Sequence, residues 1–372
     1  MTTDEAPALR RHAIYGVVLE SDFPFTHRLA AADGPAELRF THRPGRAAGW
    51  DDASPAWSSA VPGPDGAPDC VLLRRPGGEE LLRFGGIADF RLAGDRIDAW
   101  LPDAGQAWLA ELRFLGPVLA YWLERRGLVA LHAASVALPG RAGGPRAIGL
   151  LSSHGGGKSL LAAALMERAG AALLADDVSV IERAGEPAGA DGFLARPANP
   201  QMRLPPVDAE RLTGRADLPR VHPGYAKRRV PVGGADGFGR FAERPLPLAA
   251  LYVPDRRRGG EIEIERLPPA EALLALVGHS FVARLAAGAG LQPARIAVLG
   301  ALAETVPAFR LSYPDGRRHL AAVAERLAAA TSGAGSVLRE VAADRVPDAG
   351  GGVGGTREGE AADRDLLDEA GQ

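Results

Sequence analysis

The sequence predicts an α/β fold in which a small β-rich N-terminal domain precedes a larger domain of strands and helices. Residues up to about 125 consist of short apolar runs separated by Pro and Gly, which is typical of strands joined by turns. From residue 126 onward a strand, a glycine loop, a helix and another strand follow one another, as in a βαβ unit. We therefore expect domains at 1–125 and 126–332, followed by a tail over 333–372.

The strand-length runs of the first domain are YGVVLES, AELRFTH, CVLLRRPGGEELLRF and ADFRLAGDRIDAWL. After them the apolar residues recur at spacings of three and four, from Trp108 to Trp122, which predicts a buried connecting helix. Gly116 and Pro117 interrupt this spacing, so we expect a break or kink in the helix there.

The second domain begins with two apolar runs of strand length, LVALHAASVAL and RAIGLL. SLLAAALMERAG then predicts a helix, because it consists of strong helix formers and ends at Gly170. AALLADDVSVIE predicts one further strand, joined to the earlier strand by a right-handed crossover in a parallel sheet. A Pro-, Gly- and Arg-rich region follows over 184–245, then a strand, a charged β pair and helices near 269–304 and 316–330. The glycine-rich, charged segment from 333 is typical of a disordered tail.

Composition restricts the classes of partner. The chain has 372 residues, a net charge of −3 and 46% hydrophobic residues, which is ordinary for a soluble globular protein and argues against nucleic acid as a partner. We see no signal-peptide pattern and no unbroken run of about 18 apolar residues, so we expect a cytoplasmic protein without a membrane segment. The single cysteine, Cys70, fits a reducing compartment. A homo-oligomer is compatible with the sequence, which does not decide the oligomeric state.

The stretch SSHGGGKS, residues 152–159, carries the end of the phosphate-loop pattern G-x-x-x-x-G-K-[ST], with Ser152 in place of the first glycine. In such a loop backbone N–H groups surround a phosphate, and glycines permit positive φ and close approach. Lys158, one of two lysines in the chain, would neutralise the β- and γ-phosphates, and Ser159 would hold Mg²⁺. A glycine-rich turn is the structural alternative, but the preceding strand and following helix favour a nucleotide site. Its expected residues are Ser153, His154, Gly155, Gly156, Gly157, Lys158, Ser159 and Leu160.

Two adjacent carboxylates, Asp176 and Asp177, follow on the next predicted strand. A neighbouring strand of this length would place them beside the bound phosphates. One carboxylate can hold Mg²⁺, and the other can accept the proton of a substrate hydroxyl. An Asp-Asp turn after a strand is the structural alternative.

The stretches LHAASVAL, SSHGGGKS and RAGAALLADD match the central pattern of the HPr serine kinase/phosphorylase family in order and spacing. The chain resembles this family over residues 131–181, and it resembles more closely the shorter HPr kinase-related proteins found near peptide-modification genes. The looser similarity extends over residues 10–330. The resemblance implies a P-loop HPr-kinase-like domain and an ATP- and Mg²⁺-dependent serine kinase whose acceptor is a peptide or small protein.

The resemblance also assigns residues. It implies that Gly155, Gly157, Lys158 and Ser159 hold the nucleotide and Mg²⁺, and that His132 is the family's active-site histidine. It gives Asp176 the role of general base and Asp177 that of a metal-linked or second catalytic carboxylate, and the two roles are exchangeable. The expected catalytic residues are therefore Asp176, Asp177, His132 and Lys158, and the expected metal ligands are Ser159 and Asp177.

The chain departs from the family pattern at Ser152, His154 and Gln201. Gln201 stands where the family has a glutamate that serves the metal and the reverse phosphorolysis. A neutral amide is a weaker Mg²⁺ ligand, which argues against a phosphorylase activity and against HPr as the substrate. Arg203 and Lys227 are candidate contacts to phosphate or substrate, with structural or solvated roles as the alternative. Two other functions stay open, a non-catalytic nucleotide-binding regulatory module and a P-loop small-molecule kinase.

Overall fold

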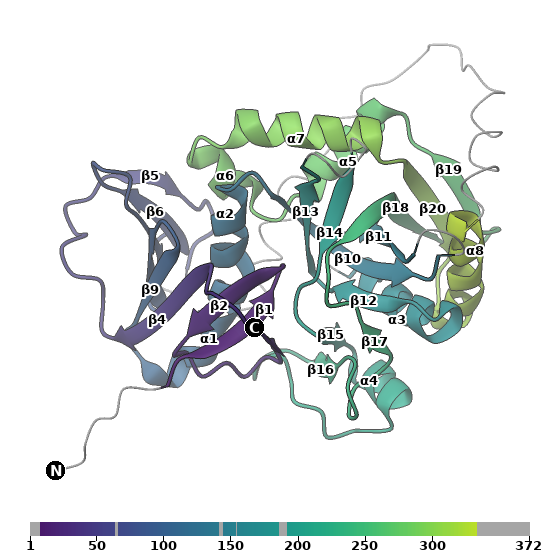
Figure 1. Ribbon diagram of the computed structural model, residues 1–372, viewed down its shortest axis with the longest axis horizontal. Coiled ribbons are helices and arrows are strands. Elements are labelled where there is room, and N and C mark those ends of the chain that lie inside the picture. The colour runs from purple at the N-terminus through teal and green to yellow at the C-terminus, as the bar shows by residue number, and fades with distance from the viewer. Residues whose placement is uncertain (1–7, 64–65, 141–143, 154, 186–191, 333–372) are drawn as a thin grey trace.

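The computed structural model describes residues 8–63, 66–140, 144–153, 155–185 and 192–332. Over these residues the protein is a mixed α/β structure with two large β-sheets and helices packed against both (Figure 1). The α/β class expected from the sequence is therefore confirmed. The expected tail over 333–372 and the loop residue His154 lie outside the described residues.

The first sheet is formed by the N-terminal part of the chain. Among the described residues it contains nine strands in the order β3-β1-β2-β4-β9-β8-β7-β6-β5. Strands β5 to β9 form an antiparallel meander, whereas β4 is parallel to both of its neighbours. The bounds are β1 (Arg10–Ile14), β2 (Val17–Ser21), β3 (Ala30–Ala31), β4 (Leu38–Pro44), β5 (Pro55–Ser58), β6 (Cys70–Arg74), β7 (Glu80–Phe84), β8 (Ala88–Ala93) and β9 (Arg96–Leu101).

One face of this sheet packs against a helical segment. Leu38 and Phe40 of β4 are buried while Arg39 between them is exposed, because successive side chains of a strand face opposite sides. Phe40 stacks on Phe114 with ring centroids 3.6 Å apart. Gly116 has non-helical angles (φ −96°, ψ −107°), which confirms the expected break. The segment comprises a 3₁₀ turn (Ala104–Gln106), α1 (Ala107–Arg113), a π-helical turn (Phe114–Val118) and α2 (Leu119–Glu124).

The second sheet carries the glycine loop. Its strand order is β17-β12-β10-β13-β14-β18-β20-β19, and β11 pairs with both β10 and β18. The central strand β10 is buried along its whole length, in agreement with its continuous apolar run. The bounds are β10 (Val129–Leu138), β11 (Arg146–Leu151), β12 (Ala172–Ala175), β13 (Val178–Arg183), β14 (Phe193–Arg196), β17 (Arg240–Phe241), β18 (Leu246–Arg257), β19 (Glu263–Arg266) and β20 (Ala308–Pro314).

The strand pairing around the loop differs from the expected parallel βαβ unit. Helix α3 (Lys158–Ala169) joins β11 to β12, but β10 lies between these two strands and is antiparallel to both. β11 and β12 therefore run in the same direction but are separated by the antiparallel β10, so the expectation of a parallel sheet at this crossover is wrong. Parallel pairing occurs on the other side, where β11 pairs with β18 and β18 pairs with β20. The strand β10, which carries His132, lies between β11 and β12 and so prevents these two strands from pairing directly.

Helices cover both faces of the second sheet, and β10 shows how. Ala134 and Val136 pack in one cluster with residues of α3 and α8, whereas Leu131 and Ala133 pack in another with residues of α5 and α7. The helices expected near 269–304 and 316–330 are confirmed. Their bounds are α5 (Pro269–Gly278), α6 (Ala283–Gly288), α7 (Gln292–Thr305) and α8 (Leu320–Ser332), the last preceded by a 3₁₀ turn (Arg317–His319).

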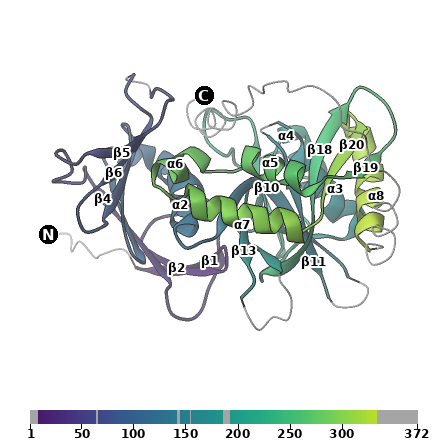
Figure 2. The ribbon, with the colours of Figure 1, turned by 90° about the horizontal axis from the view of Figure 1, so that it is seen from above.

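The Pro-, Gly- and Arg-rich region contains a small two-stranded sheet of β15 (Gln201–Leu204) and β16 (Arg228–Pro231), and the helix α4 (Pro206–Thr213). Helix α7 runs along one side of the molecule, from α6 toward the second sheet (Figure 2). One hydrophobic cluster contains residues of the first sheet together with Ala130, Ala175 and Val178. Apolar packing is therefore continuous across position 125, and the division into two domains at that point stays a prediction.

Candidate functional site

The expected phosphate loop lies between the end of β11 and the start of α3. Gly155 and Gly157 have φ of 72° and 89°, in the left-handed region that glycine enters without steric cost. Gly157 is the N-cap of α3, and because glycine has no side chain, no side-chain group caps the start of this helix. The first N–H groups of a helix have no partner within it, and with the helix dipole they favour an anion at this position.

Gly156 is needed for a different reason. A Cβ atom at this position would overlap Ser152 Oγ and would lie 3.0 Å from Ser153 O, so a larger residue would collide with the loop. Ser152 is buried, and its hydroxyl donates to Ser153 O at 3.1 Å. The serine that replaces the first glycine of the motif is therefore accommodated inside the loop, with Gly156 making room for it.

Three of the expected catalytic residues meet beside the start of α3. Lys158 Nζ lies 2.6 Å from His132 Nε2 and 3.9 Å from Asp177 Oδ1. His132 Nε2 lies 3.2 Å from the same carboxylate oxygen. Lys158 and His132 are both buried. The structure thus brings together residues from β10, from the first turn of α3 and from the turn between β12 and β13.

The two aspartates form a sharp turn that divides the strand expected over AALLADDVSVIE. β12 ends at Ala175 and β13 begins at Val178, whose N–H donates to Asp176 O at 3.0 Å. Asp177, the middle residue of this turn over residues 176–178, has a φ of 76°. Aspartate is one of the few side chains that adopts positive φ readily, and such strained positions concentrate at functional sites.

Nitrogen atoms of three basic side chains surround the Asp177 carboxylate. Arg203 Nη1 lies 2.8 Å from Oδ2, while His132 and Lys158 approach Oδ1. Burial alone would raise the pKa of Asp177, but the charges of Arg203, His132 and Lys158 outweigh burial and hold the pKa well below its ordinary value. Asp177 is therefore a strong electrostatic partner for cations and a weak acceptor of protons.

Asp176 makes contacts of another kind. Its Oδ1 accepts the Ser159 hydroxyl at 2.7 Å, and its Oδ2 accepts the backbone N–H of Arg203 at 2.9 Å. Ser159 is therefore joined to Asp176, whereas the sequence paired Ser159 with Asp177 as metal ligands. Mg²⁺ prefers oxygen ligands and binds in kinases through one or two carboxylates plus phosphates, so the Ser159 and Asp176 oxygens fit this ion. Within the described ranges, no three His, Cys, Asp or Glu side chains gather into a metal-binding group.

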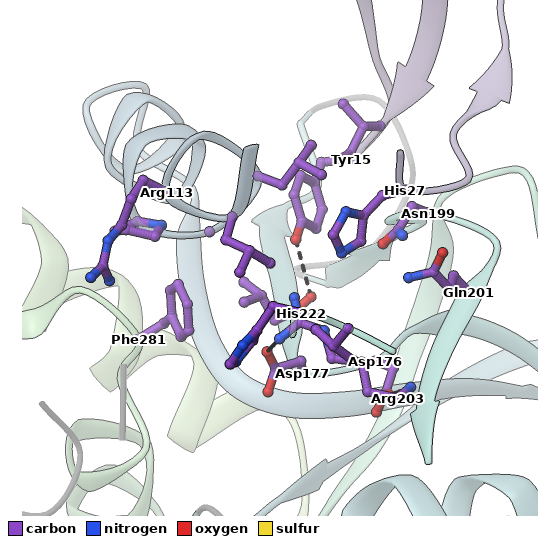
Figure 3. Close-up of a pocket in the computed structure, with 17 residues that line it drawn as sticks. Tyr15, His27, Arg113, Asp176, Asp177, Asn199, Gln201, Arg203, His222 and Phe281 are labelled. Carbon is purple, nitrogen blue, oxygen red and sulfur yellow. Dashed lines mark hydrogen bonds and ion pairs between the residues drawn. The ribbon is translucent and has the colours of Figure 1, made fainter. Parts of the chain in front are cut away.

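A cavity of about 60 Å³ lies beside the two aspartates (Figure 3). A buried water needs at least roughly 10–15 Å³ of such space, so the cavity holds a few water-sized groups. Segments far apart in the sequence supply its walls. The polar lining that bears on function comes from Tyr15, His27, Asp177, Asn199, Gln201 and Arg203.

Tyr15 and His27 are site residues that the sequence did not predict. Tyr15 and Gly16 form the two-residue turn between β1 and β2, with φ of 53° and 67°. Hairpin turns with two positive φ values favour Asn, Asp or Gly, so a tyrosine there is the one local signal of a constrained position. The Tyr15 hydroxyl donates to Val178 O at 3.4 Å, directly after the aspartates.

The remaining candidates have separate positions. Arg203 belongs to the cluster around Asp177. The Gln201 side-chain oxygen accepts the backbone N–H of Arg28 at 3.2 Å and so ties β15 to the N-terminal part of the chain. Lys227 Nζ lies 5.4 Å from the ring centroid of Tyr225. Lys227 therefore lies over an aromatic ring.

Arg256 and Tyr313 also lie beside the glycine loop, and the sequence did not predict them as site residues. Arg256 donates through Nη2 to Gly155 O at 2.8 Å. Tyr313 Oη would lie 3.8 Å from a Cβ at Gly157; it is buried and hydrogen-bonds to no residue in the part of the chain that the structure describes. Arg256 and Tyr313 lie near the carboxyl ends of β18 and β20, and the loop follows the carboxyl end of β11. Ligands of α/β proteins bind at this edge of parallel strands.

None of the helices in the described ranges is both long and apolar enough to span a membrane. No protein-family model matches the sequence, and no curated protein matches it. The geometry of the loop, the aspartates and the cavity is therefore the basis for assigning a function.

Proposed function

We propose that the protein is an ATP-dependent, HPr-kinase-like serine kinase that transfers a phosphoryl group to a hydroxyl on a peptide or small protein. The observation that carries this proposal is the charged cluster of Lys158, His132, Asp177 and Arg203 beside a glycine loop at a helix N-terminus. Phosphoryl transfer depends mainly on positioning and on neutralisation of charge. The loop supports the first requirement, and the cluster supports the second.

The loop backbone and the start of α3 would hold the phosphates, with Lys158 as the principal cation. Lys158 Nζ contacts His132 and Asp177, so it would exchange these contacts for phosphate oxygens when a nucleotide binds. The flexible four-carbon stem of lysine permits this movement. Arg256, bonded to Gly155 O, is a second cation at the loop.

Ser159 and Asp176 would hold Mg²⁺, which, when bound, neutralises charge that develops on the phosphates. This assignment exchanges the roles that the resemblance gave to the two aspartates. It follows from the hydrogen bond of Ser159 to Asp176 and from the ion pairs that engage Asp177. Asp177 then lies on the acceptor side, where its charge orients the groups around the cavity.

The cavity supports a peptide or small protein as the acceptor. Its volume of about 60 Å³ suits a hydroxyl-bearing side chain, whereas small-molecule sites occupy about 300–1,000 Å³. A serine side chain would fill the cavity while the remainder of a peptide stays outside. The alternative of a small-molecule kinase would require a deeper pocket beside the aspartates.

Gln201 supports a kinase without phosphorylase activity. Its side-chain oxygen already accepts the Arg28 N–H, so the residue at the position of the family's glutamate serves a contact within the protein. An amide is also the weaker metal ligand. We therefore propose phosphoryl transfer without the reverse phosphorolysis.

Incubation with γ-labelled ATP, Mg²⁺ and serine-containing peptides, followed by mass spectrometry, tests the proposal. We expect a phosphoserine on the acceptor peptide, and no transfer by Lys158→Ala or Asp176→Asn while circular dichroism shows both variants folded. Wild-type transfer by either variant would contradict the proposal. ATP binding without transfer to any peptide would favour the alternative, a non-catalytic nucleotide-binding module.

A further inference from the structure

We infer that His27, oriented by Glu111, receives the proton of the acceptor hydroxyl, so that the N-terminal part of the chain supplies a catalytic residue. This inference rests on the proposed kinase function. Neither aspartate suits the task well. Both carboxylate oxygens of Asp176 already accept hydrogen bonds, and Asp177 is engaged by cations on both of its oxygens.

His27 lies in the wall of the cavity, beside Tyr15 and Asn199 (Figure 3). The residue is 6% exposed. Its Nε2 atom is buried and forms no hydrogen bond with any of the residues that the structure describes. A buried polar atom without a partner destabilises the folded protein, so such atoms call for an explanation, such as a catalytic role. A hydroxyl in the cavity would provide the missing partner.

The other ring nitrogen faces a carboxylate. His27 Nδ1 lies 3.0 Å from Glu111 Oε1, which is within ion-pair distance although the angle is unsuitable for a hydrogen bond. Burial alone would raise the pKa of Glu111, but its contacts with His27 and Thr26 lower the pKa, so Glu111 is ionised. A carboxylate beside Nδ1 favours the tautomer with the proton on Nδ1. The lone pair of Nε2, on a residue that lines the cavity, is then available to accept a proton.

Contacts from several elements fix the segment that carries His27. Glu111 accepts the backbone N–H groups of both Thr26 and His27 at 2.7 Å. Arg229 of β16 donates to Thr26 Oγ1 at 2.8 Å. With Gln201 bound to the next residue along the chain, the segment is held from three sides. A general base oriented by a third group is the arrangement that activates a hydroxyl nucleophile.

The proposed step moves one proton to His27 and one phosphoryl group to the acceptor. The acceptor O–H bond breaks while its oxygen forms a bond to the γ-phosphorus, and the proton passes to His27 Nε2. The bond between the γ-phosphorus and the oxygen that bridges to the β-phosphorus breaks, and ADP leaves with that electron pair. When water occupies the cavity in place of a peptide hydroxyl, the same step releases inorganic phosphate.

Burial, together with two nearby arginines, lowers the pKa of His27 and favours the neutral ring. Burial lowers the pKa of His27, Glu111 raises it in part, and Arg203 and Arg229 lower it further. Because the pKa lies below the ordinary value of about 6.5, the ring can accept a proton near pH 7, and the rate should fall only in more acidic solution. The other ionisable groups that line the cavity are Tyr15, Arg113, Asp176, Asp177 and His222.

Hydrolysis of Mg-ATP by the full chain tests the inference without a known peptide, because water serves as the acceptor. We expect His27→Asn to bind Mg-ATP with wild-type affinity and to hydrolyse it at least about a hundredfold more slowly than wild type. The hydrolysis rate of this variant should no longer fall as the solution becomes acidic. Added imidazole should restore part of the rate to His27→Ala. His42→Asn is the matched control, because His42 Nδ1 also lies 3.0 Å from a carboxylate, on Asp22, but His42 does not line the cavity.

The possible results distinguish failure of the inference from failure of the proposed function. Wild-type hydrolysis by His27→Asn would overturn the inference and leave the kinase function standing. Loss of both thermal stability and nucleotide affinity in His27→Ala, without rescue by imidazole, would show a structural role and would also overturn it. A wild-type protein that neither binds nor hydrolyses Mg-ATP would overturn the proposed function and the inference together.

Discussion

One ring nitrogen, His132 Nε2, lies between two neighbours that need opposite protonation states. It is 2.6 Å from Lys158 Nζ and 3.2 Å from Asp177 Oδ1. An unprotonated Nε2 accepts from the lysine, whereas a protonated Nε2 donates to the carboxylate. If a bound phosphate drew Lys158 away, His132 Nε2 would keep only its contact with the Asp177 carboxylate. The position of Lys158 therefore decides which contact His132 makes.

Lys158→Met should weaken Mg-ATP binding by roughly tenfold to a hundredfold, which corresponds to the loss of about 1.5–3 kcal/mol from charged hydrogen bonds. Isothermal titration calorimetry measures this change directly. The matched control is Arg168→Met, because Arg168 is on the same helix but is exposed and pairs with Glu325 at 2.8 Å. Equal losses in the two variants would show that only the general charge of α3 matters.

Asp177→Asn should lower the free energy of unfolding at neutral pH by about 1.5–3 kcal/mol, because the charged contacts to Arg203 and His132 are lost. Asparagine tolerates positive φ as aspartate does, so the turn is kept. The folded-state pKa of Asp177 lies below its unfolded value of about 3.9. Its charge therefore contributes stability above about pH 4, and this contribution is lost as the pH falls through the folded-state pKa.

Denaturant unfolding of wild type and Asp177→Asn from about pH 7 to about pH 2 measures this dependence. The two free energies of unfolding should converge as the solution becomes acidic. A difference that stays constant over this range would show that the charge of Asp177 is not what stabilises the fold.

At the scale of an element, the conformation of the glycine loop depends on how Gly156 packs against Ser152. Gly156→Ala should reduce Mg-ATP affinity, because the new Cβ would overlap Ser152 Oγ. Adding Ser152→Gly removes that overlap, although Ser153 O would remain 3.0 Å away, so the double variant should recover part of the affinity. Calorimetric titration of the single and double variants with Mg-ATP makes the comparison.

Gly300→Ala in α7 is the control for this substitution, because a Cβ at Gly300 meets no atom within 4 Å. It should leave Mg-ATP affinity unchanged and stabilise the helix by about 0.5–1 kcal/mol. Normal binding by Gly156→Ala, or a double variant no better than the single one, would contradict the proposed packing inside the loop.

Local pattern predicted most elements of the second sheet because their apolar runs are long and clearly bounded. The strand β10, the loop and α3 lie where the sequence placed them, and the side chains of His132 and Lys158 contact each other. The turn at Asp176 and Asp177 was predicted only as the structural alternative, because an apolar run continues on both sides of the two aspartates and favours one strand. The position of β10 between β11 and β12 was also missed, because pairing between distant strands leaves no mark on local periodicity.

At the scale of the whole molecule, the cavity combines segments that only folding brings together. Tyr15 and His27 come from the first sheet region, whereas Asp177 and Gln201 come from the second part of the chain. Residues so far apart share no spacing that could be recognised as a motif. The sequence therefore predicted the glycine loop and the two aspartates of the candidate site, and it did not predict the cavity residues Tyr15 and His27.

Glu124 of α2 and Arg295 of α7 form a buried ion pair that joins the helices beside the two sheets (Figure 2). Their atoms Oε2 and Nε are 2.9 Å apart, and each side chain is 2% exposed. Arg295→Met should lower the free energy of unfolding by about 3–5 kcal/mol, because it leaves a carboxylate buried without its cation. Glu124 also accepts the Ala130 N–H at 3.2 Å, so a second change to Glu124→Gln keeps an acceptor and should recover most of the loss.

The pH dependence of Arg295→Met separates the buried charge from lost packing. Burial raises the pKa of Glu124 even with Arg295 present, and removing the cation should raise it further. A raised folded-state pKa adds stability that is present at low pH and is lost as the pH rises through that pKa. Arg295→Met should therefore regain stability relative to wild type between about pH 7 and about pH 5 in denaturant unfolding, whereas a packing defect would leave the same deficit at both pH values.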